Sequence, residues 1–178
     1  MPLEAIKLLI LDVDGVLTDG TLTLTATGEP VKNFHVQDGF AIKLWQRAGG
    51  KVALLSGRDS NIVSARVAGL GIDIILQGAN DKAVAYETIK QQAHFDDPAI
   101  AYVGDDIPDL PPMRRCAFAV AVRNAVPTVK QAAHYITRRP GGQGAVAEIV
   151  EFILRKQSRW KAVIENAEKP AEGSVPRP

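Results

Sequence analysis

Residues 6–20 read Ile-Lys-Leu-Leu-Ile-Leu-Asp-Val-Asp-Gly-Val-Leu-Thr-Asp-Gly, an aliphatic run that stops abruptly at two aspartates. Short aliphatic runs that end in polar residues and glycine are typical of buried strands in a parallel sheet. Comparable runs follow at residues 52–55, 72–76, 100–103 and 118–122. We therefore expect residues 6–11 to be the first of several parallel strands.

Longer segments with a helical pattern separate these runs. Apolar residues recur three or four positions apart, as a helix packed on a sheet requires, over residues 38–48, 60–69, 82–93 and 144–156. Strands that alternate with helices predict an α/β fold, namely a Rossmann-like parallel sheet with helices on both faces.

One segment between the first strand and the first helix has a different pattern. Residues 21–35 contain two β-prone stretches around Gly28. This pattern predicts a short β-hairpin over about residues 18–35, in place of a separate cap domain.

The size and composition of the chain fit a single domain. It has 178 residues, of which 46% are apolar and 23% are charged, and such a chain can bury its own core. We place this domain at residues 1–157 and treat residues 158–178 as a C-terminal extension. The last part of the extension, from Glu168, is polar and proline-rich, which predicts flexibility.

Charge and cysteine content narrow the possible partners. The net charge is +1 and the charged residues are well mixed, which argues against nucleic acid or an anionic membrane and favours a small molecule. The run at residues 6–11 is too short to span a bilayer. The single cysteine, Cys116, can form no internal disulfide, and we expect it to be buried and inert. Together these features predict a soluble, cytoplasmic protein.

Polar segments follow the predicted strands. In chain order they are Asp12 and Asp14, then Ser56-Gly57-Arg58, then Asp105 and Asp106, with Lys82 at the start of the helix after the third strand. Open parallel sheets bind ligands beyond the carboxyl ends of their strands. Several carboxylates at that edge would repel one another unless a hard divalent cation lay among them. The pattern therefore predicts a magnesium site.

Two carboxylates at one strand end also suit phosphoryl transfer. Asp12 can attack phosphorus and form an aspartyl-phosphate, while Asp14 can protonate the leaving alkoxide and later deprotonate the attacking water. The Ser56 hydroxyl and the Lys82 ammonium can stabilise charge on the transferring group. These four residues are the candidate catalytic residues.

The motifs resemble those of the haloacid dehalogenase-like phosphatases, in the same order, over about residues 6–110. The matching stretches are Asp12-Val-Asp-Gly-Val-Leu-Thr-Asp-Gly20, Ser56-Gly-Arg58, Lys82 and Gly104-Asp-Asp-Ile-Pro-Asp109. The resemblance implies a magnesium ion held by the Asp12 side chain, the Asp14 backbone carbonyl and the Asp105 side chain. It gives Asp106 and Asp109 supporting roles and places Lys82 and Ser56 on the phosphate.

Further stretches resemble one small-cap subfamily, the phosphatases of 3-deoxy-D-manno-octulosonate 8-phosphate, which serve lipopolysaccharide precursor synthesis. These stretches are Phe34-His-Val-Gln-Asp-Gly39, Gly57-Arg-Asp-Ser60 and Arg139-Pro-Gly-Gly-Gln-Gly-Ala-Val146. The resemblance implies substrate contacts at Asp14, His35, Val36, Gln37, Asp38, Gly39, Lys43, Arg58, Arg66 and Lys82. Two of these, Arg58 and Arg66, would suit the carboxylate of a sugar acid.

The subfamily also implies an assembly. Its members form homotetramers in which hairpins associate and a neighbour's C-terminal segment helps to close the site. The glycine-rich residues 141–144 suit such a close backbone approach.

Other functions stay open on sequence grounds. The same chemistry could act on a nonulosonate 9-phosphate of the sialic acid type. A receiver-type signalling domain also combines a parallel sheet, acidic residues and a lysine, but here no aspartate ends the third run at Leu76-Gln77. A catalytically silent binding subunit on the same fold is a third alternative. Arg58 and Arg66, taken alone, could also be surface ion-pair residues.

Overall fold

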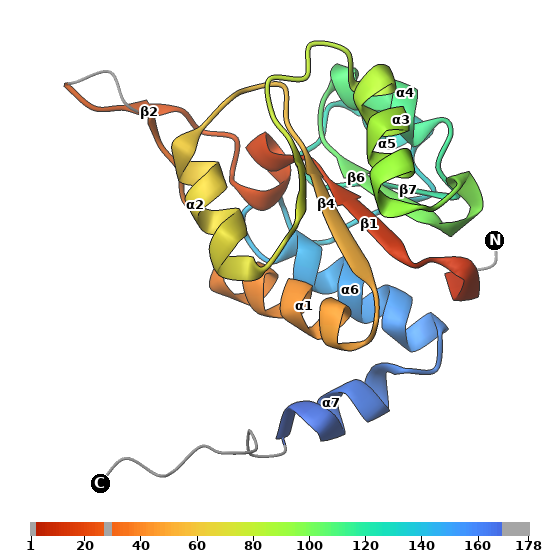
Figure 1. Ribbon diagram of the computed structural model, residues 1–178. Coiled ribbons are helices and arrows are strands. Elements are labelled where there is room, and N and C mark those ends of the chain that lie inside the picture. Colours follow the sequence, from red (N-terminus) through yellow and green to blue (C-terminus); the bar gives the residue numbers. More distant parts are fainter. Residues whose placement is uncertain (1–2, 27–29, 169–178) are drawn as a thin grey trace, which may run out of the picture.

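A central parallel sheet organises the computed structural model, which describes residues 3–26 and 30–168 (Figure 1). The sheet has six strands in the order β5-β4-β1-β6-β7-β8. Their bounds are β1 Leu8–Leu11, β4 Lys51–Leu55, β5 Ile74–Leu76, β6 Ile100–Gly104, β7 Phe118–Ala121 and β8 Tyr135–Ile136. All neighbouring strands in it run parallel, as the sequence predicts.

Strand β1 lies at the centre of the sheet. It pairs with β4 on one side and with β6 on the other, so that Leu11 is level with both Leu54 and Val103. Every residue of β1 is fully buried, which explains its uninterrupted aliphatic sequence. The residues that follow β1 and β6 therefore leave the same edge of the sheet side by side.

Helices cover both faces of the sheet (Figure 1), as predicted. On one face lie α1 and α6, with α2 beside α1, and on the other lie α3, α4 and α5. Helix α7 packs against α1 and α6. The bounds are α1 Val36–Arg47, α2 Asn61–Leu70, α3 Lys82–Ala93, α4 Leu110–Met113, α5 Pro127–Ala132, α6 Ala145–Lys156 and α7 Trp160–Glu168. None of the helices within the described ranges has the length and apolar character needed to cross a bilayer.

The predicted hairpin is present. Strands β2 (Thr23–Leu24) and β3 (Pro30–Val31) pair antiparallel and project from the body (Figure 1). Its predicted turn at Gly28 lies outside the described residues.

Several short elements escaped the sequence analysis. Strand β8 and helices α4 and α5 have two to six residues, too few to show a period. Helix α7 occupies the start of the predicted C-terminal extension, and the part from residue 169 onward lies outside the described residues. Cys116 is buried and unpaired, as predicted, and burial raises the pKa of its thiol to about 12.

A buried carboxylate ties α1 to α6. Asp38, in the first turn of α1, is 1% exposed. Its oxygens accept hydrogen bonds from the backbone N–H groups of Gly144 (3.2 Å) and Ala147 (2.8 Å) at the start of α6. A carboxylate at a helix N-terminus satisfies donors that have no partner within the helix. Asp38 therefore has a structural task, which the sequence analysis did not foresee when it assigned the residue to substrate.

We expect Asp38→Ala to lower the free energy of unfolding by about 2 kcal/mol, because it removes this cap and leaves buried N–H groups without an acceptor. Thermal or urea unfolding measures the loss. Asp73→Ala, which removes an exposed carboxylate between α2 and β5, is the matched control and should be nearly neutral. Equal stability of the two variants would contradict the capping role.

Candidate active site

The loop after β1 turns sharply and carries Asp12 and Asp14. Gly15 has a φ of +101°, and a Cβ atom at this position would lie 2.1 Å from Asp105 Oδ2. The Thr18 hydroxyl accepts hydrogen bonds from the N–H groups of Gly15 and Gly20 and donates to the Val13 carbonyl, each at 3.3 Å. The loop is thus held against the end of β6, and only glycine fits at the point of contact.

A second glycine-rich segment supports this loop from behind. The Gly142 N–H donates to the Val16 carbonyl at 2.9 Å, and a Cβ atom on Gly141 would lie 1.6 Å from the Gly15 carbonyl oxygen. The resemblance linked residues 141–144 to a neighbouring subunit. The structure shows that Gly141 and Gly142 approach the chain's own loop.

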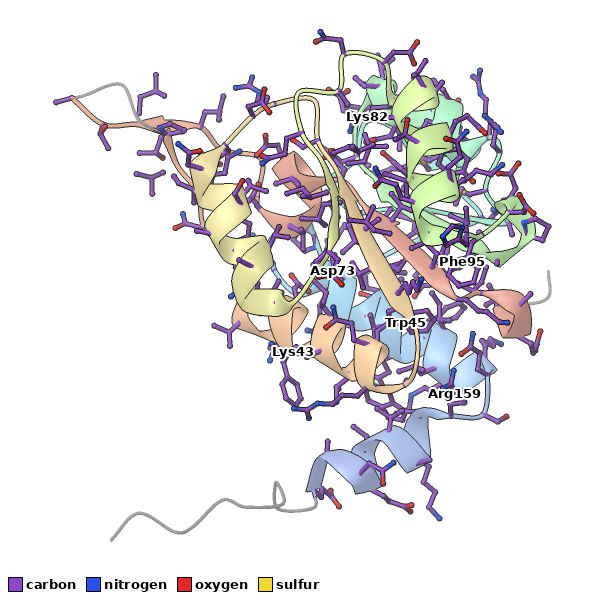
Figure 2. The ribbon with its side chains drawn as sticks, viewed as in Figure 1. Lys43, Trp45, Asp73, Lys82, Phe95 and Arg159 are labelled. Carbon is purple, nitrogen blue, oxygen red and sulfur yellow. The ribbon has the colours of Figure 1, made fainter. Side chains whose placement is uncertain are left out.

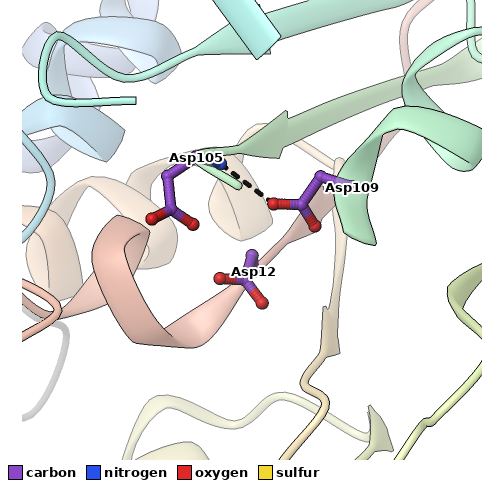
Figure 3. A group of neighbouring side chains, drawn as sticks. All are labelled: Asp12, Asp105 and Asp109. Atoms are coloured by element: carbon purple, nitrogen blue, oxygen red, sulfur yellow. Dashed lines mark hydrogen bonds between the residues drawn. The ribbon is translucent and has the colours of Figure 1, made fainter. Parts of the chain in front are cut away.

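Three carboxylates meet at the edge of the sheet (Figure 3). Asp12 follows β1, and Asp105 and Asp109 follow β6. One oxygen from each carboxylate lies within 4.8 Å of the others. Asp12 and Asp109 are only 5% and 1% exposed, so water does little to screen their charges.

Lys82 places an ammonium between two of these carboxylates. It is the first residue of α3 and is buried. Its Nζ donates to Asp12 Oδ1 at 2.6 Å and to Asp109 Oδ1 at 2.7 Å. Asp81 caps the same helix by accepting from the Ala83 N–H at 2.8 Å. This cap fixes the start of α3 and with it the position of Lys82.

The hydrogen bonds that Asp109 accepts agree with the supporting role that the resemblance implies for it. Its Oδ1 accepts from Lys82 and from the Tyr102 hydroxyl (2.7 Å), and its Oδ2 accepts from the N–H groups of Asp105 (2.9 Å) and Asp106 (3.2 Å). Four donors fill the acceptor positions of one carboxylate. The Asp106 side chain accepts from the Ile107 N–H at 2.7 Å and is exposed. Asp109 thus binds the loop that carries Asp105.

The charge of this cluster is not balanced. Burial, and then the neighbouring Asp109 carboxylate, raise the pKa of Asp12 well above its ordinary value. The same two causes raise the pKa of Asp105 to about 6. Burial alone would lower the pKa of Lys82, but Asp12 and Asp109 outweigh it and raise the pKa. One ammonium faces three carboxylates, so a further cation would stabilise the site.

The oxygen donors fit magnesium. Hard divalent cations take carboxylate and carbonyl oxygens, and magnesium needs only a few of them from the protein. Asp12 keeps one oxygen that Lys82 does not use, and Asp105 points toward it (Figure 3). Since Asp109 is already occupied by four donors, the residues best able to hold the ion are Asp12 and Asp105. Asp14, whose carbonyl the resemblance adds to the ligands, lines the same cleft.

Asp14 has a cationic partner that the sequence analysis missed. Lys32, which follows β3 in the hairpin, forms an ion pair with Asp14 Oδ1, and the Lys32 side chain is only 4% exposed. No spacing rule singles out Lys32, because it lies on an irregular segment after a two-residue strand. The hairpin therefore reaches the reacting end of the cleft.

Several predicted residues line the same cleft. Its walls include Asp12, Asp14, Ser56, Arg58, Lys82, Asp105, Asp106 and Asp109. The Ser56 hydroxyl is buried, donates to the Arg58 carbonyl at 3.1 Å and accepts from the Arg58 N–H at 3.2 Å. This local turn presents the exposed Arg58 side chain to the cleft.

Other predicted substrate residues lie elsewhere. His35, Asp38, Gly39 and Arg66 line a separate small hollow with Leu17 and Phe34. The Arg66 guanidinium lies 5.7 Å from the centre of the Phe34 ring, and a Cβ atom on Gly39 would lie 2.2 Å from Arg66 Nη2. Gly39 thus makes room for Arg66.

The last three predicted contacts are not among the residues that line the cleft. Val36 is 80% exposed, and the Gln37 side chain accepts from Arg139 Nη1 at 2.9 Å. Lys43 lies on α1, far from Lys82 (Figure 2). Within one chain, the cleft gathers the phosphate-side residues and Arg58, and leaves most sugar-side residues apart.

The chain is similar in sequence to known hydrolases. A family model described as haloacid dehalogenase-like hydrolase matches residues 61–150. The 3-deoxy-D-manno-octulosonate 8-phosphate phosphatase KdsC of Haemophilus influenzae is 44% identical over 157 residues, which cover 88% of this chain and 87% of that protein.

Solved structures give the same picture. A cobalt-bound deoxy-D-mannose-octulosonate 8-phosphate phosphatase from Haemophilus influenzae aligns with a TM-score of 0.88 and 42% identity, covering 91% of this chain and 95% of that chain. A 3-deoxy-D-manno-octulosonate 8-phosphate phosphatase from Moraxella catarrhalis, in complex with magnesium, phosphate and KDO, aligns with a TM-score of 0.90 and 36% identity, covering 93% and 95%.

The excess of carboxylates in this cluster predicts that, without metal, the stability of the folded protein falls as the pH rises. The pKa of Asp105 rises from 3.8 to about 6 on folding, so folding favours its protonated form. In EDTA, the stabilisation this group contributes is present below pH 3.8 and is lost as the pH rises through about 6. We expect the melting temperature of Asp105→Asn, compared with wild type, to depend less on pH in EDTA and to rise less when magnesium is added.

Asp73→Asn is the control, because it neutralises an exposed carboxylate outside the cleft. Thermal melts of the three proteins between pH 4 and 8, the range that spans the ordinary and raised values, measure both effects. Identical pH slopes and identical magnesium shifts for wild type and Asp105→Asn would contradict the assignment.

Proposed function

The chain belongs to the haloacid dehalogenase-like hydrolases, and on that premise we propose that it is a magnesium-dependent phosphatase of 3-deoxy-D-manno-octulosonate 8-phosphate. It releases 3-deoxy-D-manno-octulosonate and phosphate, and so serves lipopolysaccharide precursor synthesis. The observation that carries the proposal is the cluster in which Lys82 bridges Asp12 and Asp109 beside Asp105. Relatives that share most of this chain are named for the same substrate.

The first step transfers the phosphoryl group to the protein. An Asp12 carboxylate oxygen forms a bond to phosphorus as the bond from phosphorus to the sugar oxygen breaks. The Asp14 carboxyl gives its proton to the departing alkoxide. The second step reverses these roles: Asp14 takes a proton from water, the water oxygen attacks phosphorus, and phosphate leaves Asp12.

Other groups of the chain stabilise the transferring phosphoryl group. Lys82 already contacts Asp12 and can donate to a phosphoryl oxygen, and the Ser56 hydroxyl lies on the same cleft wall. A magnesium ion held by Asp12, Asp105 and the Asp14 carbonyl would neutralise the remaining negative charge. Arg58 lines the cleft, and its guanidinium would pair with the carboxylate of the sugar acid.

We further propose that the chain acts in the cytoplasm as a homotetramer. Large apolar side chains are exposed on the hairpin and at the start of α1: Leu22, Leu24, Val31, Val36 and Phe40. Exposed apolar patches often mark protein contacts, and an interface over the hairpin and the start of α1 would cover these side chains. On this proposal, sugar-side residues that lie outside the chain's own cleft, such as Lys43, would serve the cleft of a neighbouring chain.

Phosphate release from a panel of substrates tests the proposed function. The panel contains the octulosonate 8-phosphate, a nonulosonate 9-phosphate of the sialic acid type and simple hexose phosphates, each with magnesium or EDTA. We expect the octulosonate to be preferred and EDTA to abolish its turnover. Preference for the nonulosonate would keep the mechanism and change the substrate, whereas no turnover would favour a silent or regulatory domain.

Asp12→Asn should reduce turnover by at least about a thousandfold without unfolding the protein, because an amide is a poor nucleophile. Asp19→Asn is the control, since Asp19 lies on the same loop, is exposed and accepts a local bond from the Thr21 N–H. Substantial turnover by Asp12→Asn would remove Asp12 from the nucleophile role.

Lys32→Met should slow the hydrolysis of alkyl phosphates about tenfold more than that of p-nitrophenyl phosphate. The reason is that Lys32 holds Asp14, and an alkoxide needs a positioned proton donor whereas p-nitrophenolate leaves without one. Lys51→Met, which removes a lysine that donates to the Ala93 carbonyl away from the cleft, should affect neither substrate. Equal loss on both phosphates would show that Lys32 does not act through Asp14.

A further inference from the structure

Tyr102 places a fully buried hydroxyl beneath the active site. It is the third residue of β6 and pairs in register with Ile10 of β1 and Ala119 of β7. Its side chain is 0% exposed, and its hydroxyl donates to Asp109 Oδ1 at 2.7 Å. The sequence analysis gave Tyr102 no role, because it stands inside a strand rather than at its end.

The oxygen that Tyr102 holds is the one that Lys82 uses. Lys82 Nζ lies 2.6 Å from Asp12 Oδ1 and 2.7 Å from Asp109 Oδ1, so its position is set by two competing carboxylates. The other oxygen of Asp109 is fixed by the N–H groups of Asp105 and Asp106. Without the hydroxyl, Asp109 Oδ1 would have Lys82 as its one remaining donor among the described residues. The ammonium would then be drawn toward Asp109 and away from Asp12.

We propose that Tyr102 is a positioning residue for phosphoryl transfer: by holding Asp109 Oδ1, its hydroxyl fixes where Lys82 meets Asp12 and the phosphoryl group. This inference rests on the proposed phosphatase function, and it names a residue that acts through Asp109 and Lys82 without touching substrate. A hydroxyl that only satisfied a buried acceptor would contribute to stability and leave turnover unchanged.

Tyr86 provides a control that separates an effect on turnover from an effect on stability. Tyr86, in α3, is also 0% exposed, and its hydroxyl also donates to an aspartate, Asp97 Oδ1, at 3.0 Å. Asp97 belongs to a separate group of ion pairs with Lys90 (2.8 Å) and Arg115 (3.7 Å). Tyr86→Phe and Tyr102→Phe therefore remove the same atom from a buried tyrosine that donates to an aspartate. The Asp97 side chain is 34% exposed, against 1% for Asp109, and only Asp109 lines the active-site cleft.

We expect Tyr102→Phe to lower kcat about tenfold with little change in KM, as the loss of a hydrogen bond to a charged group would do. Tyr86→Phe should keep the kcat of wild type and should lose less melting temperature than Tyr102→Phe, because water can reach its acceptor Asp97. The substrates are p-nitrophenyl phosphate and the octulosonate 8-phosphate. A wild-type kcat for Tyr102→Phe, or an equal loss of kcat in both variants, would overturn the proposal.

Two further measurements show whether the Tyr102 hydroxyl acts through Lys82 or through the metal-binding carboxylates. In a Lys82→Met background, adding Tyr102→Phe should cost less than about twofold, because residues that act as a unit are not additive; a full additional tenfold loss would overturn the proposal. Magnesium affinity, measured by calorimetry, should change less than about twofold in Tyr102→Phe. A fall in affinity that matches the fall in kcat would place the effect on Asp105 instead and would likewise overturn it.

The wild-type measurements separate this proposal from the proposed function. Turnover of p-nitrophenyl phosphate without turnover of the octulosonate would remove the substrate assignment and leave the Tyr102 test intact. A wild-type protein that hydrolyses neither phosphate would overturn both.

Discussion

The Lys82 ammonium between Asp12 and Asp109 is the interaction on which the site depends. Burying carboxylates at one sheet edge is costly unless each is paired or hydrogen-bonded. Lys82 supplies one positive charge, Tyr102 and two backbone N–H groups supply neutral donors to Asp109, and Asp12 and Asp105 are left facing each other. Either protonation or a bound cation can relieve the remaining repulsion, so a magnesium ion would add to the stability of the site as well as to its chemistry.

The backbone is built to allow this convergence. Strands β1 and β6 are neighbours in the sheet, so the residues that follow them emerge side by side. The loop after β1 then has to pass close to Asp105, and Gly15 makes that possible. The loop is held in place from the far end of the sequence, because Gly141 and Gly142 pack on it and Asp38 of α1 caps α6 directly behind. The C-terminal third of the chain thus supports a loop formed by the first twenty residues.

Sequence reasoning found the elements of the site that follow from local pattern. Asp12, Asp14, Ser56, Lys82 and Asp105 each stand next to an aliphatic run or at the start of a helix, and the ends of parallel strands share one edge, so their convergence could be foreseen. Lys32 and the cap formed by Asp38 could not, because each depends on a contact with a residue distant in sequence. Tyr102 could not for another reason: it stands inside a buried strand, and its partner Asp109 follows only seven residues later. Strand β8 and helices α4 and α5 escaped for a different reason: they are stabilised by neighbours and are too short to show a period of their own.

The groups proposed for phosphoryl transfer and most of those proposed for sugar recognition lie in different places. Every group that acts on phosphorus in the proposed mechanism lies in one cleft of one chain, whereas His35, Lys43 and Arg66 lie outside its walls. Phosphoryl transfer needs positions accurate to fractions of an ångström, and a rigid sheet edge with buried hydrogen bonds provides them. Recognition of a sugar tolerates a looser frame, and surfaces of neighbouring chains can supply it. On the proposed assembly, each chain supplies the chemistry and the carboxylate contact at Arg58, and the neighbouring chains supply the remaining contacts to the sugar. Substrate preference could then change at the contacts between chains without disturbing Asp12, Lys82 or Asp109.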